Sequence, residues 1–96
     1  PLELMVADIY STIASIHYKM QNYRSTIEYY LKAIEIREQL SSADDPELAI
    51  NYNNLAIAYH DVGELAAAVR CFEKVVLVRL ARVSPADASL LPTYNN

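Results

Sequence analysis

Apolar side chains recur every three or four residues along four segments of the chain, with polar residues between them. This is the period of one face of an α-helix, so the pattern predicts four amphipathic helices. The first covers the sequence LMVADIYSTIASIHYKM, and the others cover about residues 24–40, 46–61 and 65–83. The stripes predicted to be buried are Leu4, Ala7, Ile9, Ile13, Ile16 and Met20 in the first helix; Ile27, Tyr30, Leu31, Ile34 and Leu40 in the second; Leu48, Tyr52, Leu55, Ala56 and Tyr59 in the third; and Leu65, Ala68, Val69, Phe72, Val76 and Leu80 in the fourth.

The residues between these segments are of the kinds that start and stop helices. Asp45 is predicted to cap the third helix, because its carboxylate accepts hydrogen bonds from free N–H groups, and Pro46 suits the first helical position. Gly63 is predicted to end that helix, since glycine accepts the left-handed backbone found at helix C-termini. The sequence QNY separates the first two helices. The four helices are therefore expected to form two hairpins.

The two hairpins repeat one another at an interval of 42 residues. Comparing residues 9–54 with residues 51–96 gives ten identical pairs, where chance would give roughly three to four, and a fixed period of this size is typical of stacked repeats. The tripeptide YNN at Tyr52–Asn54 recurs at Tyr94–Asn96.

This period predicts one domain, residues 1–96, with a first repeat at 3–44, a second at 45–86 and the start of a third at 87–96. Pro92 stands where the second repeat has Ile50, inside the expected helix, and proline breaks the hydrogen-bond ladder there. The third repeat's helix is therefore expected to start near residue 91, or to be kinked or frayed.

Composition narrows the classes of protein that fit. Hydrophobic residues make up 53% of the chain and charged residues 21%, which describes a globular chain. The net charge of −4 disfavours nucleic-acid binding, which needs a basic surface. No apolar run is long enough for a membrane span, so no membrane partner is expected. The single cysteine cannot form an internal disulfide, which fits a reducing compartment and predicts a cytoplasmic location.

No set of residues predicts catalysis, a cofactor or a metal site, so the chain is predicted not to be an enzyme. His17 and His60 have no second metal ligand at helical spacing, and His17 is expected to pack as a substitute for an aromatic ring. Cys71 lies between Arg70 and core-like positions, and an inert thiol is favoured over a reactive one.

The repeated residues resemble tetratricopeptide repeats. The second repeat carries Tyr52, Leu55, Ala56 and Tyr59 in its first helix, then Ala68 and Phe72 in its second, at the spacing of that signature. The first repeat matches less closely, with Tyr10, Ile13, Ala14, His17, Thr26, Tyr30 and Ala33. The small residues Ala14 and Ala56 are expected where paired helices approach, and Tyr10, Tyr30, Tyr52 and Phe72 are expected to fill the space between helices and repeats.

The sequences NNLA at Asn53–Ala56 and EIRE at Glu35–Glu38, together with the long period, resemble the repeats of the kinesin light chains. The resemblance implies an all-α, right-handed α-α superhelix of stacked helical hairpins. It also implies that the first helix of each repeat lines a concave groove. Such a groove suits a peptide or a helical segment of another protein.

The polar and apolar positions left free by packing are predicted to point into this groove. They are Ser11, Thr12, Ser15 and Lys19 in the first repeat and Ile50, Asn53, Asn54, Ile57, His60 and Asp61 in the second. An asparagine amide offers both donors and an acceptor to a peptide backbone, although each Asn can equally bond a neighbouring helix or face water. Tetratricopeptide domains that bind chaperone C-termini use several groove bases, and here Lys19 is the only one, so that mode of binding is not expected.

These features favour a protein-interaction module that presents a peptide-binding groove within a larger scaffold, adaptor or sensor. An alternative left open by the sequence is a structural spacer, or a repeat that self-associates through its exposed ends to form a homo-oligomer, with no peptide ligand.

Overall fold

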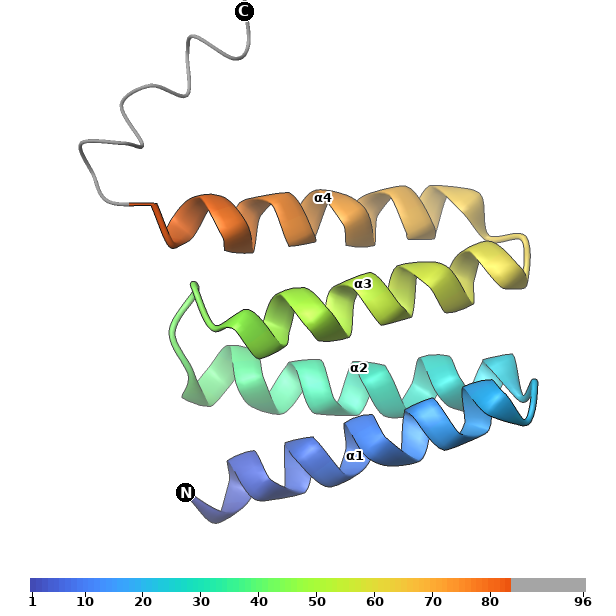
Figure 1. Cartoon of the computed structure of the whole chain (residues 1–96), viewed down its shortest axis with the longest axis horizontal. Helices are drawn as coiled ribbons and strands as arrows, with labels where there is room; N and C mark the ends of the chain where they lie inside the picture. Colours follow the sequence, from blue (N-terminus) through green and yellow to red (C-terminus); the bar gives the residue numbers. More distant parts are fainter. Residues whose placement is uncertain (84–96) are drawn as a thin grey trace, which may run out of the picture.

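In the computed structural model, which describes residues 1–83, the chain forms four α-helices: α1 (Leu2–Lys19), α2 (Tyr23–Leu40), α3 (Pro46–Asp61) and α4 (Leu65–Ala81). They lie side by side in chain order, each antiparallel to the one before (Figure 1). The tightest pairs are α1 with α2 and α3 with α4, and α2 packs on α3. The predicted all-α fold of stacked hairpins is confirmed. The expected third repeat at 87–96, with Pro92, lies outside the described residues.

The predicted ends of α3 are confirmed. The Asp45 carboxylate accepts a hydrogen bond from the Glu47 N–H at 3.0 Å, and Pro46 is the first helical residue. Gly63 follows the helix with φ of +85°. Gln21, which is 42 residues earlier, has φ of +64° in the turn between α1 and α2. A residue with a side chain is thus held in the left-handed conformation that its counterpart Gly63 adopts at little cost.

Small side chains allow the two helices of each hairpin to approach closely. Ala7 and Ala14 of α1 are buried, and so are their counterparts Ala49 and Ala56 of α3. Since each alanine has the same burial in both hairpins, these positions face the partner helix of their own hairpin. The role predicted for Ala14 and Ala56 is consistent with this packing.

The two hairpins are joined by a polar cluster at the α2–α3 turn. The Arg37 side chain is buried and donates to Asp45 at 2.9 Å and to Asp8 of α1. Burial alone would raise the pKa of Asp45, but hydrogen bonds from Glu47 N–H and from Ser41, together with the Arg37 charge, lower it. One carboxylate therefore caps α3 and also neutralises the buried guanidinium of α2.

The predicted buried stripes of α1 and α4 are partly wrong. Ile9, Ile16 and Met20 are exposed on α1, where Ala7 and Ala14 are the buried residues. On α4 the exposed members are Leu65, Val69, Phe72 and Val76, and the buried residues are Ala68, Cys71, Val75 and Val78. Both helices lie at an end of the described stack. One of their two apolar faces packs inside the hairpin, and no helix of residues 1–83 covers the other.

Two further corrections concern α2 and the aromatic residues. Leu31 and Leu40 were predicted in the α2 stripe, yet both are exposed because they lie off the faces that α1 and α3 cover. Phe72 was expected to fill an inter-repeat space and is 42% exposed. His17 does replace an aromatic residue, since its ring stacks on Tyr29 at 5.6 Å between centroids with an interplanar angle of 8°.

Candidate functional site

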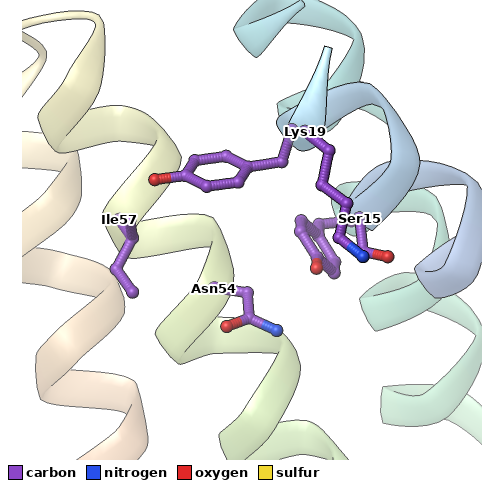
Figure 2. A pocket seen from close by; sticks show the side chains of 6 residues that line it. Ser15, Lys19, Asn54 and Ile57 are labelled. Carbon is purple, nitrogen blue, oxygen red and sulfur yellow. The ribbon is translucent and has the colours of Figure 1, made fainter. Parts of the chain in front are cut away.

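A pocket opens between the first helices of the two hairpins. It has a volume of about 210 Å³ and is lined by Ser15, Tyr18 and Lys19 of α1, Tyr30 of α2, and Asn54 and Ile57 of α3. Figure 2 shows Ser15 and Lys19 on one side and Asn54 and Ile57 across from them. Helical spacing explains this grouping, because residues three or four apart on one helix share a face. The α1–α3 groove, as we call this surface, is thus built from three helices and both repeats.

The pocket combines apolar walls with a few polar groups. Tyr30 is buried, and this burial raises the pKa of its hydroxyl, while the neighbouring Asn54 amide opposes that shift. The hydroxyl is therefore neutral near pH 7 and can both donate and accept. Asn54 is half-buried beside it. Ile57 supplies apolar surface one turn further along α3.

Charge lies at the rim of the pocket. Lys19 is exposed and is the only charged residue among those that line it. The Tyr18 hydroxyl donates to the Asp61 carboxylate at 2.8 Å, which ties α1 to the end of α3. This hydrogen bond is the main reason that the pKa of Tyr18 is raised. Asp61 is thus engaged by a tyrosine of the other repeat, whereas the Lys19 ammonium has no ion-pair partner within residues 1–83.

The other predicted groove residues occupy different environments. The Ser11 hydroxyl donates to the side-chain Oδ1 of buried Asn51 at 3.0 Å, and the Thr12 hydroxyl donates to the Asp8 backbone oxygen of its own helix at 3.0 Å. Ile50 and His60 are exposed, Asn53 is half-buried, and none of the three lines the pocket. The structure therefore brings four of the predicted residues together in the pocket and leaves Ser11, Thr12, Ile50, Asn53, His60 and Asp61 outside it.

Sequence reasoning missed three residues that shape this site. Tyr30 was grouped with the packing aromatics and Tyr18 was not singled out, although each presents its hydroxyl to a polar group across the groove. Asn51 was not singled out, although it is almost fully buried and joins α3 to α1 through Ser11. A signal was present for Asn51. It lies three residues after Leu48 and four before Leu55, inside the buried stripe of α3.

The environment of Cys71 does not favour a reactive thiol. Cys71 is a buried free thiol, and burial raises its pKa more than Arg70 lowers it. It is therefore protonated near pH 7, which agrees with an inert thiol. Within residues 1–83 no cluster of three or more His, Cys, Asp or Glu side chains could hold a metal ion. Over the same range, none of the helices has the length and apolar character needed to cross a bilayer.

A family model described as tetratricopeptide repeat matches residues 5–79, which is most of the chain. The chain therefore belongs to the tetratricopeptide repeat family. Its long, kinesin-light-chain-like repeat is consistent with this match. No curated protein matches the chain. Domains of this family generally mediate protein–protein interaction and are generally not catalytic.

Proposed function

We propose that the α1–α3 groove binds an extended peptide segment of a partner protein, and that the chain serves as an interaction module within a larger scaffold, adaptor or sensor. The pocket lined by both repeats carries this proposal, because it joins apolar walls to a small number of polar groups. A cytoplasmic location belongs to the same proposal, since Cys71 is a buried free thiol.

The lining chemistry suggests how a peptide would sit. An apolar side chain would enter between Tyr30 and Ile57, where it would lose contact with water. The Asn54 amide would pair with a backbone N–H or C=O, because it carries both kinds of group. Lys19 would favour an acidic residue next to the apolar one.

The groove does not favour capture of a terminal carboxylate as the main binding mode. A terminal carboxylate is best held by several bases or by a fork of N–H groups, as arginine provides. The pocket offers one lysine and no arginine. Internal peptide segments are therefore the proposed ligands.

A library of random short peptides displayed on phage provides a probe that needs no known partner. Peptides selected on the full chain would be titrated against wild type and against Asn54→Ala, which removes the amide. Losing one neutral hydrogen bond costs about 1 kcal/mol, or roughly fivefold in affinity. Gln39→Ala is the matched control, because Gln39 is an exposed amide on α2 outside this pocket and should leave affinity unchanged.

Backbone amide shifts recorded during the same titration locate the binding surface. Shifts gathered on Ser15–Lys19 and Asn54–Ile57 would support the proposal. Shifts confined to α2 and α4, or equal losses for both variants, would contradict it. A failure to select any peptide would favour the structural spacer, for which Asn54→Ala has no effect on any partner.

A further inference from the structure

The outer face of α4 is apolar and open, although the matching face of α2 is covered. Ile27, Tyr30 and Ile34 of α2 are between 4% and 7% exposed, because α3 packs on them. Their counterparts 42 residues later on α4, Val69, Phe72 and Val76, are between 42% and 56% exposed. With Leu65, these three residues form what we call the α4 end face. Contiguous apolar patches of this kind mark interaction surfaces.

A second open face lies at the other end of the stack, on α1. Val6, Ile9, Ile16 and Met20 are exposed and form what we call the α1 end face. The α3 residues in the same register are Leu48, Asn51 and Ala58, which are buried, and Val62, which packs partly against the core. Ala7 and its α3 counterpart Ala49 are both buried. The α3 residues that are buried while their α1 counterparts are exposed are therefore the ones that the preceding hairpin covers.

These two comparisons identify complementary surfaces. The α4 end face corresponds to the face of α2 on which α3 packs. The α1 end face corresponds to the face of α3 that packs on α2. We infer that the α1 end face of one copy docks on the α4 end face of a second copy, so that the α2–α3 interface is repeated between chains. This inference concerns the ends of the stack and does not depend on the proposed groove.

Charge supports the same register. Inside the chain, Arg37 near the end of α2 pairs with Asp45 at the start of α3. The residue 42 positions after Arg37 is Arg79, which is exposed on α4, and the residue 42 positions before Asp45 is Glu3, which is exposed on α1. Docking in this register brings Arg79 of one copy close to Glu3 of the other. The base then lies on the second helix of one hairpin and the acid on the first helix of the next, as Arg37 and Asp45 do within the chain. Arg70 and Lys74 add positive charge along α4.

The docking is head to tail, so it uses two different surfaces on each copy. A contact of this type leaves one free end of each kind and can add further copies instead of closing as a dimer. The product is a longer stack of the same repeat, as in other solenoids. Each added copy covers one α1 end face and one α4 end face.

The chain's own residues 86–96 are a competing occupant of the α4 end face, because Asp87, Leu90 and Tyr94 repeat Asp45, Leu48 and Tyr52. Pro92 stands inside that sequence, where proline removes a hydrogen bond and clashes with the preceding turn. An uninterrupted α3-like helix is better supplied by α1 of a second copy. The two occupants give opposite results in the experiment below.

Sedimentation velocity on four samples tests the inference, at concentrations up to about 1 mM, where weak protein contacts form. They are wild type, Ile9→Glu, Val76→Glu and an equimolar mixture of the two variants. Ile9 and Val76 are exposed in the single copy, so neither change should disturb the fold, and circular dichroism checks this. Wild type is expected to form dimers and larger species. Each variant alone should be monomeric, while the mixture should form dimers only, since one intact face of each kind remains.

Three results would overturn the inference. The first is wild type that stays monomeric across the whole range. The second is either variant forming dimers by itself, which would show a symmetric contact between like faces. The third is association that appears or strengthens in Leu90→Asp/Tyr94→Asp, which would show that residues 86–96 cover the α4 end face. Gln39→Glu adds the same charge to an exposed site of α2 away from the interface, and its association should match that of wild type.

Discussion

α2 and α4 are the second helices of two hairpins in the same register, yet their outer apolar faces have opposite environments. α3 covers the face of α2, and no helix within residues 1–83 covers that of α4. The inner faces do not differ in this way, since Ala33 of α2 and its counterpart Val75 of α4 are both buried. In a stacked fold, the hairpin sets the burial of one face of a helix and the next repeat sets the burial of the other.

The largest expected effect comes from truncating the aromatic at this position in each repeat. Tyr30→Ala removes a ring buried under α3 and should lower the free energy of unfolding by about 3 kcal/mol. Phe72→Ala removes a ring that no neighbouring hairpin within residues 1–83 covers, and it should cost less than about 1 kcal/mol. Urea unfolding at low protein concentration, where self-association is negligible, measures both. Equal losses would show that the two faces have the same environment.

A smaller difference is expected between the two aligned arginines. Arg37 is buried against Asp45 and Asp8, so Arg37→Ala leaves the Asp45 charge without its partner and should cost about 2 kcal/mol. Arg79 is exposed, and an exposed charge of this kind contributes at most about 0.5 kcal/mol. Thermal unfolding of Arg37→Ala and Arg79→Ala at matched pH compares them. An Arg79→Ala loss as large as that of Arg37→Ala would mean that Arg79 already has a buried partner.

The smallest expected effect lies in the two turns. Gln21 has the positive φ that suits Gly63, so Gln21→Gly should stabilise the first hairpin by about 0.5–1 kcal/mol. The reciprocal change Gly63→Ala should destabilise the second by about 1 kcal/mol, because a Cβ at φ of +85° is strained even with open space around it. Chemical denaturation provides the measurement. A loss of stability in Gln21→Gly would contradict the assignment of strain to this turn.

Local features of the fold were predictable from sequence because they depend on nearby residues. The bounds of α3, its cap at Asp45 and the turn at Gly63 follow from helix chemistry that acts within a few positions. The exposure of Ile9 and Phe72 was not predictable, since periodicity identifies an apolar face without showing whether a neighbour covers it. Their 42-residue counterparts, buried in the same molecule, supply the missing comparison.

The site was predictable to a similar extent. Ser15, Lys19, Asn54 and Ile57 were identified because the register places them on the faces left free by packing. The tyrosines of the pocket were not, because a tyrosine can pack its ring and still present its hydroxyl to a cavity. The composition of the site depends on how two hairpins meet, and helical spacing describes only one helix at a time.

Hydroxyl-radical footprinting read by mass spectrometry tests most directly whether α3 covers α2 while the matching face of α4 is open. It reports the solvent exposure of Tyr30, Ile34, Phe72 and Val76 in one sample of the wild-type chain. At low concentration, Tyr30 and Ile34 should be protected from oxidation, while Phe72 and Val76 should be oxidised readily. Similar oxidation of the two pairs would contradict the stacking of the second hairpin on the first.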